Sequence, residues 1–189
     1  SNFENQNNND WLSDASLITS YNKNLNQNYR IKIDSALQTS KNYIQKTKPN
    51  DDLSYKNSLS TNINFEGFNL NKIDDYFKVS LNFYQTNQEN EDNKTIPIVL
   101  PKIKYYSGNY NKYGNSYNHN LEIYNIIREK GTNVHAKNQQ KVSHTYNLKR
   151  TFINFNSKVS MNAEIYNQAY YTEDKILENG LYKSGSYYR

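Results

Sequence analysis

Apolar and polar residues alternate with a period of two along several stretches of this chain. In YRIKIDSALQ, which begins at Tyr29, the tyrosine, both isoleucines and the leucine all lie at odd-numbered positions. Arg30, Lys32, Asp34 and Gln38 lie at even-numbered positions. Successive side chains of a β-strand point to opposite faces, so this pattern predicts a strand with one apolar and one polar face. The same alternation recurs in SLSTNINFEGF, YFKVSLNFYQ, YNHNLEIYNI and FINFNSKVSMNAEIY.

Clusters of Asn, Asp, Lys, Gly and Pro separate the alternating segments and are typical of turns. The sequence has no clear helical period and no exact internal repeat. We therefore predict an all-β chain, an antiparallel meander of about eight or nine long strands joined by hairpins. The strands are expected near Leu12–Tyr21, Tyr29–Ser40, Ser54–Glu66, Asp75–Gln85, Ile96–Tyr106, Tyr117–Arg128, Val134–Tyr146, Thr151–Tyr166 and Leu181–Tyr188.

Several predicted strands have ten or more residues, whereas strands of globular sheets usually have about five or six. A strand that spans a bilayer needs about 9–11 residues, with one face toward lipid and the other free to be polar. Only 35% of the residues are hydrophobic, too few for a well-filled soluble core, while 19 Tyr and 7 Phe argue against disorder. These features favour an arc of a large transmembrane outer-membrane β-barrel. A soluble β-sandwich also alternates, and alternation alone does not separate the two.

Charge and composition exclude several kinds of protein. The net charge of +5 is spread along the chain and leaves no clustered nucleic-acid footprint. The absence of Cys excludes disulfides and thiolate metal sites. No run approaches the roughly 20 apolar residues of a transmembrane helix, and the first ten residues do not resemble a signal peptide. Without an initiating Met, the 189 residues are expected to be a single fragment, truncated at both ends, of a longer protein.

The histidines and serines offer no convincing reactive site. His135 and His144 are an odd number of positions apart and would face opposite sides of one strand, so a metal shared between them, or with His119, is not expected. Ser143 and His144 are neighbours and point apart, and no carboxylate is placed to orient the imidazole. The Tyr-rich segment YYSGNYNKYGNSY lacks the Gly-Lys-Ser/Thr ending of a phosphate loop and is expected to be an extracellular or periplasmic loop with interfacial tyrosines. We predict no catalytic, cofactor-binding or metal-binding residues and no enzyme activity.

Several short motifs occur in the order in which they occur in a known family. They are the Glu-Gly-Phe element at Glu66–Phe68, the Phe-x-Gln element at Phe83–Gln85, the acidic loop at Glu89–Asp92, the Pro-x-x-Leu-Pro strand at Pro97–Pro101, and the Arg-x-x-Gly-Thr hairpin at Arg128, Gly131 and Thr132. Over roughly Tyr29–Asp174 the chain resembles the barrel portion of the lipopolysaccharide-assembly protein (LptD) family, also called organic solvent tolerance proteins. The family's periplasmic jelly-roll domain, its cysteines and its terminal aromatic strand have no counterpart here.

This resemblance implies a function in the outer membrane of a Gram-negative cell. The full protein would be a translocon that accepts lipopolysaccharide from a periplasmic bridge protein, through a domain absent from this fragment, and inserts it into the outer leaflet. A lipoprotein would plug the lumen, membrane lipid would surround the barrel, and no nucleic acid or cofactor would be involved. The lateral gate would lie outside this chain. Two alternatives stay open, another outer-membrane barrel such as a porin or receptor, and a soluble β-sandwich adhesin repeat.

Two prolines lie in the most apolar stretch, NKTIPIVLPKIKYYSG. Proline leaves a ladder hydrogen bond unmade and is confined to strand starts, edges and bulges. We expect Pro97 to open a strand at the membrane boundary and Pro101 to loosen pairing midway. The alternative is that both prolines end strands around a short apolar linker.

The barrel hypothesis assigns a side to each alternating residue. Charged residues would face the lumen, either along a path for an anionic glycolipid or simply in contact with water; they are Lys32, Asp34, Lys78, Glu122, Lys158 and Glu164. The residues expected to face lipid are Leu59, Ile63, Val79, Leu81, Ile123, Phe155 and Val159. Arginine in place of Val79 or Val159 should therefore impair assembly more than arginine in place of Ser80 or Ser160.

Overall fold

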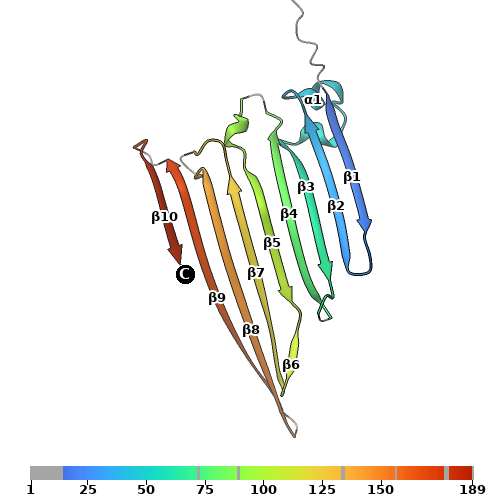
Figure 1. Cartoon of the computed structure of the whole chain (residues 1–189), viewed down its shortest axis with the longest axis vertical. Coiled ribbons are helices and arrows are strands. Elements are labelled where there is room, and N and C mark those ends of the chain that lie inside the picture. The colour runs from blue at the N-terminus through green and yellow to red at the C-terminus, as the bar shows by residue number, and fades with distance from the viewer. Residues whose placement is uncertain are drawn as a thin grey trace, which may run out of the picture.

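The strands of the chain form one antiparallel sheet (Figure 1). A computed structural model describes residues 15–188 other than 72, 89, 133–134, 156 and 177–178. The strands are β1 (Ser16–Asn24), β2 (Tyr29–Gln38), β3 (Ser58–Phe68), β4 (Asp75–Thr86), β5 (Ile98–Ser107), β6 (Tyr110–Lys112), β7 (Asn115–Ile127), β8 (Asn138–Asn154), β9 (Ser157–Ile176) and β10 (Tyr182–Tyr188). The helices are α1 (Tyr43–Thr47) and the 3₁₀ turns η1 (Asp52–Tyr55) and η2 (Asn93–Thr95). The all-β prediction is confirmed.

Each strand pairs with the next one along the chain, as a meander requires. The order is β1-β2-β3-β4-β5-β7-β8-β9-β10, with β6 alongside β7. Within the described ranges the sheet has ten strands, not eight or nine, because the Tyr-rich segment predicted to be a loop forms the three-residue β6. Gly114, with a φ of 76°, makes the turn from β6 into β7. In the described part of the chain β1 and β10 do not pair, so the sheet is open.

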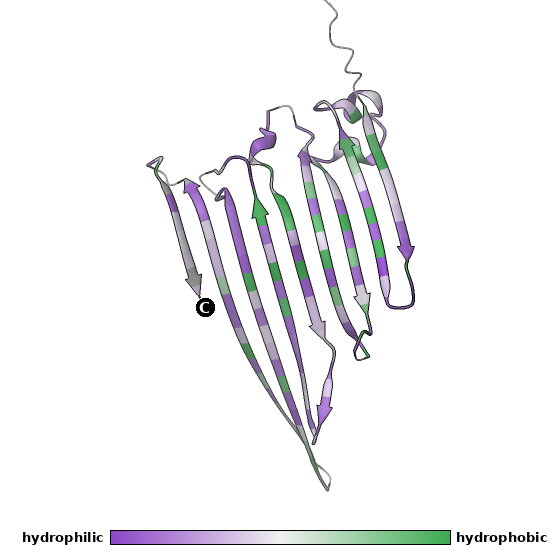
Figure 2. Ribbon diagram, in the orientation of Figure 1, coloured by the Kyte–Doolittle hydropathy of each residue, from purple (hydrophilic) through white to green (hydrophobic). Residues whose placement is uncertain are grey.

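The register keeps apolar and polar residues on separate faces. One row from β2 to β8 is apolar throughout and consists of Ile31, Phe65, Val79, Ile103, Ile123 and Val142. The neighbouring row points the other way and consists of Arg30, Glu66, Lys78, Lys104, Glu122 and Ser143. We call these two surfaces the apolar face and the polar face. Figure 2 shows the resulting alternation of hydrophobic and hydrophilic residues along the strands, which confirms the predicted period of two.

An aromatic cluster on the apolar face explains the glycine of the Glu-Gly-Phe element. The rings of Tyr29 and Phe65 stack with centroids 5.7 Å apart, and Phe77 meets Phe65 edge to face at 5.5 Å. A Cβ on Gly67 would lie 2.1 Å from the Phe77 ring, a distance that no packing allows. Gly67 therefore lets Phe77 lie directly over the backbone of β3.

The described part of the chain has almost no buried hydrophobic core. Its buried hydrophobic residues are Ala36, Ile44, Leu59 and Ala136. Ile44 of α1 packs with Ala36 and Leu59, and Leu53 of η1 packs against them. Leu59 is only 1% exposed, so the prediction that it faces lipid is wrong, because the segment that contains α1 and η1 covers it. Too little apolar volume for a packed core was expected from the composition.

A buried amide network fixes that small segment to the end of the sheet. The side chain of Gln85 in β4 accepts a hydrogen bond from the Gln38 amide in β2 at 3.1 Å and donates one to the Gln38 carbonyl oxygen at 2.7 Å. The side chain of Gln38 also donates to Asn87 Oδ1 and accepts from the amide of Ile44. Asn87 in turn donates to the carbonyl oxygens of Leu53 and Lys56. These bonds satisfy polar groups that the short helices would otherwise bury without partners.

Pro97 opens β5, and Pro101 interrupts its pairing, as predicted. Pro97 immediately precedes the strand, and Pro101 lies inside it. The register shifts on both sides of Pro101, between Ser80 and Asn82 toward β4 and between Val99 and Lys102 toward β7. The Leu100–Pro101 peptide bond is cis, and the Leu100 carbonyl accepts from the Asn125 side chain at 3.0 Å. The linker alternative is therefore wrong.

Several predicted boundaries differ from those observed. The strand predicted over Thr151–Tyr166 is wrong, because β8 continues to Asn154 and the chain turns at Phe155, which has a φ of 45°. Ile153 and Val159 therefore lie on opposite faces, since Ile153 pairs with Lys158 and Phe152 with Val159. The predicted strand starting at Ser54 begins instead at Ser58, after η1.

Some predictions concern residues outside the described part. They are the first residues of the predicted strand Leu12–Tyr21, Glu89 of the acidic loop, Val134 at the start of a predicted strand, and Asn156, assigned to a polar face.

None of the described helices combines the length and hydrophobicity that crossing a membrane requires. A β-sandwich needs a second sheet packed on the first. The described residues form one sheet, so the soluble β-sandwich alternative does not fit this part of the chain.

Candidate functional site

Glu66 is the centre of an ionic cluster on the polar face. It is 6% exposed and lies in β3 between Arg30 of β2 and Lys78 of β4. Arg30 contacts Glu66 Oε2 through Nη2 at 2.5 Å and through Nε at 2.7 Å, and Lys78 Nζ lies 3.3 Å from Oε1. The Tyr76 hydroxyl donates to Oε1 at 3.2 Å. One carboxylate thus holds two cations and a phenol in place.

The Glu-Gly-Phe element supplies both this carboxylate and an aromatic ring beside it. The Arg30 guanidinium lies 5.2 Å from the centroid of Phe68, and Phe68 packs against Tyr76 at 5.3 Å. This contact with the ring helps to hold the guanidinium beside Glu66. Gly67, between them, serves the opposite face. Glu66 and Phe68 therefore position Arg30 on the polar face of β3, and Gly67 accommodates Phe77 on its apolar face.

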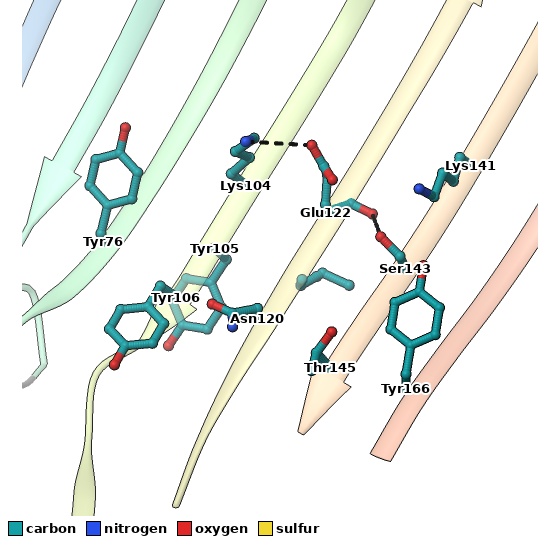
Figure 3. A pocket seen from close by; sticks show the side chains of 11 residues that line it. Tyr76, Lys104, Tyr105, Tyr106, Asn120, Glu122, Lys141, Ser143, Thr145 and Tyr166 are labelled. Carbon is teal, nitrogen blue, oxygen red and sulfur yellow. Dashed lines mark hydrogen bonds and ion pairs between the residues drawn. The ribbon is translucent and has the colours of Figure 1, made fainter. Parts of the chain in front are cut away.

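A second ionic cluster lies further along the same row. Glu122 Oε1 of β7 accepts ion pairs from Lys102 at 3.3 Å and from Lys104 at 3.6 Å, both on β5. Figure 3 shows Lys104 and Glu122 reaching toward one another, with Lys141 on the neighbouring strand. Asp34 forms a third, more exposed pair with Lys32 at 2.9 Å. The predicted same-face placement of the strand charges is confirmed by the register.

Two shallow hollows lie between these clusters. One has a volume of about 360 Å³, and Tyr76, Tyr106 and Tyr166 line it together with Lys104, Glu122 and Lys141 (Figure 3). The other has a volume of about 520 Å³ and is lined by Asn, Ser, Tyr and Lys side chains of β3, β4 and β5 and by Asp34 of β2. Hydroxyl, amide and ammonium groups therefore line both hollows. Such a surface can donate many hydrogen bonds to a polar, negatively charged molecule.

Basic residues outnumber acidic residues on the polar face. The basic ones are Arg30, Lys32, Lys78, Lys102, Lys104, Lys141, Lys149 and Lys158. The acidic ones are Asp34, Glu66, Glu122 and Glu164. Every acidic residue in the first two clusters is already shared between two cations, so the excess charge is positive. Opposite charge attracts an anionic partner, whatever its identity.

The histidines are arranged differently from the prediction. His135 lies in the loop before β8, so it does not share a strand with His144. His119 and His144 lie on adjacent strands on the apolar face, with ring centroids 5.5 Å apart, and Tyr105 meets His119 at 5.6 Å. Sequence reasoning missed this pair because it compared positions within one strand. No group of three potential ligands for a metal occurs among the residues that the structure describes.

Ser143 and His144 point to opposite faces, as predicted. Ser143 lies opposite Glu122 on the polar face and lines the smaller hollow, whereas His144 lies opposite Leu121 on the apolar face. Adjacent strand residues cannot form a nucleophile–base hydrogen bond across the sheet. This pair therefore does not form a catalytic dyad.

The Arg-x-x-Gly-Thr segment forms a hairpin loop between β7 and β8. Arg128 is buried, and its Nη1 donates to the Ala136 carbonyl at 3.0 Å and to Gln139 Oε1 at 3.2 Å. Burial lowers the pKa of the Arg128 guanidinium. A Cβ on Gly131 would lie 2.8 Å from the carbonyl oxygen of Asp174, so only glycine allows the loop to approach β9. These contacts give the segment a role in shaping the loop.

Comparison with known proteins does not identify a family for this chain. No family model matches the chain, and no curated protein or solved structure matches it either. The structural evidence on function is therefore the arrangement of the two faces.

Proposed function

We propose that the sheet is an arc of the wall of a large outer-membrane barrel. The observation that carries this proposal is a single-layer sheet whose apolar face, in the described part of the chain, is covered only around Leu59 by the α1–η1 segment. In water such a face is unfavourable, whereas a bilayer provides an apolar solvent for it. The many strands of nine or more residues are long enough to cross the hydrocarbon layer.

We propose further that the full-length protein is a translocon that inserts lipopolysaccharide into the outer leaflet of a Gram-negative outer membrane. Lipopolysaccharide is a phosphorylated glycolipid, and its anionic, hydroxyl-rich head suits a surface of lysines, tyrosines and amides. The motifs that resemble the LptD family lie on consecutive elements from β3 to the β7–β8 loop. In this proposal a lipoprotein plugs the lumen, and a periplasmic bridge protein supplies the substrate through a separate domain.

Another outer-membrane barrel, such as a porin or receptor, is a second candidate. A polar, charged inner face also suits a water-filled channel. The excess of lysines around the hollows favours anionic solutes in that case too. The two candidates differ in whether a glycolipid touches the polar face during transport.

Adjacent tyrosines allow a test that separates these candidates. Tyr105 and Tyr106 both border the smaller hollow, but only Tyr106 points to the polar face, whereas the Tyr105 ring points to the apolar face beside His119. A photo-cross-linking phenylalanine analogue is placed at either position in the full-length protein in cells. At Tyr106, adducts with lipopolysaccharide should form while new glycolipid is delivered and stop when its synthesis is blocked. At Tyr105, lipid adducts should persist through the block. A Tyr106 probe that never captures lipopolysaccharide would favour a porin or receptor.

A further inference from the structure

The β8–β9 hairpin extends beyond the rest of the sheet as a two-stranded ribbon. The last β7 partner of β8 is Asn115, opposite Arg150, and the remaining pairs, Thr151–Asn154 with Ser157–Ser160, involve β8 and β9 alone. Figure 1 shows this hairpin projecting past the neighbouring strands at the end opposite α1. We call residues 151–155 and 157–160 the β8–β9 tip. At about 3.3 Å per residue, its four pairs reach roughly 13 Å beyond the edge of β7.

Large apolar side chains are exposed on both surfaces of the β8–β9 tip. Phe152 and Val159 lie opposite each other on one surface, and Ile153 lies on the other. Ile153 is 76% exposed, and Phe155, at the turn, is 100% exposed. In the body of the sheet, by contrast, the polar face carries mostly charged and amide side chains. Ile153 therefore breaks, at the tip, the alternation that distinguishes the two faces.

The backbone of the turn provides an independent observation. Two residues connect β8 to β9, and two-residue hairpins favour Asn, Asp or Gly, because their central positions require a positive φ. Phe155 occupies the first position with a φ of 45°, a conformation that bulky residues rarely adopt. Folding alone would favour a smaller residue there. A wholly exposed phenyl ring at a strained turn is explained if the ring contacts something outside the chain.

The charges around the tip indicate what that partner is. Lys149 and Arg150 are exposed at the base of the ribbon, and Lys158 is exposed close to its turn, opposite Ile153. Residues 149–163 contain no Asp or Glu. The Arg150 guanidinium lies 4.7 Å from the centroid of the Phe152 ring, which keeps one cation beside the apolar side chains. Apolar side chains flanked by Lys and Arg are the composition of segments that insert into the headgroup region of anionic membranes.

We propose that the β8–β9 tip inserts into an anionic phospholipid surface, with Phe155 and Ile153 among the acyl chains and the three basic residues at the phosphates. This contact is separate from the apolar face. The tip projects along the strands, so the surface it enters lies beyond the end of the sheet and is not the bilayer that the barrel wall would span. The proposal therefore does not depend on the function proposed above. Hydrophobic insertion reaches about 5–10 Å into a bilayer, which is less than the length of the tip. The neighbouring β6–β7 turn should therefore remain in water.

Tryptophan fluorescence tests the proposal on the whole chain. The chain has one Trp, at position 11, so Phe155→Trp is made in a Trp11→Phe background. The protein is kept soluble in a non-ionic amphipol and added to vesicles of phosphatidylcholine, with or without an equal part of phosphatidylglycerol. With phosphatidylglycerol, the emission should shift to shorter wavelength and be quenched by brominated acyl chains. The matched control is Tyr113→Trp at the β6–β7 turn, where Tyr113 is 86% exposed, and its emission should not change.

Two further variants separate lipid binding from folding. Glycine adopts a positive φ without strain, so Phe155→Gly should leave the circular dichroism spectrum unchanged. It removes the phenyl ring, so vesicle binding should be lost. Lys158→Gln should weaken binding to anionic vesicles about fivefold, since each basic residue near the surface contributes a comparable factor. Emission at Phe155→Trp that stays as water-exposed as at Tyr113→Trp would overturn the proposal. Ile63→Trp, on the apolar face, tests the barrel-wall proposal separately. Quenching of its emission under the same conditions would support that proposal even if Phe155→Trp were not quenched.

Discussion

At the scale of single residues, Glu66 is the most constrained charge on the polar face. Its carboxylate is buried and accepts from Arg30, Lys78 and Tyr76, whereas Asp34 is partly exposed and contacts Lys32 and Ser20. Hydrogen bonds to a buried charged group contribute more than an ion pair that water surrounds. The alternation of the sequence predicted the face of each charge. It did not predict their partners, because partners across strands depend on register.

We expect Glu66→Ala to destabilise the fold by about 1.5–3 kcal/mol, because it leaves Arg30 and Lys78 facing each other without a counter-charge. Asp34→Ala, the matched control, should shift the unfolding midpoint much less, since water surrounds both Asp34 and its partner Lys32. The measurement is a urea titration of the chain in detergent micelles, followed by circular dichroism. Equal shifts of the two midpoints would show that the Glu66 cluster has no special role in stability.

At the scale of elements, strands with regular alternation were predicted closely and irregular segments were not. β2, β4 and β7 begin and end within a few residues of the expected positions. The turn at Phe155 was missed because it has neither Gly nor Pro, and the surrounding Asn and Ser are common throughout the chain. α1 and η1 are too short to show a helical period. Such segments owe their structure to tertiary contacts, here the amide network around Gln38.

The structure also changes the choice of residues for testing the two faces. Ser80 is buried, so arginine there would be crowded, and Val159 lies on the projecting β8–β9 tip. Ile63 and Asn62 in the middle of β3 form a better pair. Ile63→Arg on the apolar face should cost about 2–4 kcal/mol of membrane stability and reduce assembly. Asn62→Arg beside Asp34 and the larger hollow should be tolerated. Folded and unfolded fractions of the full-length protein in membranes, separated by heat-modifiable gel migration, measure both effects.

At the scale of the whole molecule, the sequence predicted one sheet with unlike faces but not how the sheet is completed. Closure depends on which strands pair with β1 and β10, and local patterns along a strand carry no information about a distant partner. The candidate surface was predicted in the same partial way. Its charged and aromatic residues were recognisable on their strands, whereas the hollows arise only when the strands lie side by side. The smaller hollow needs β4, β5, β7, β8 and β9, and the larger one needs β2, β3, β4 and β5.

The open edges lead to a prediction for the isolated 189-residue chain. Among the described residues, the outer edges of β1 and β10 have no strand partner, and the apolar face is covered only around Leu59 by the α1–η1 segment. Unpaired edges recruit other strands, and exposed apolar surface associates in water. The chain should therefore aggregate in plain buffer and become monodisperse in detergent, as measured by size-exclusion chromatography with light scattering. Detergent should act by covering the apolar face, so Ile63→Asn and Val79→Asn together should reduce the aggregation. A β-rich, monodisperse monomer of the unaltered chain in buffer would contradict the membrane proposal, because a sheet with this apolar face would then be stable in water.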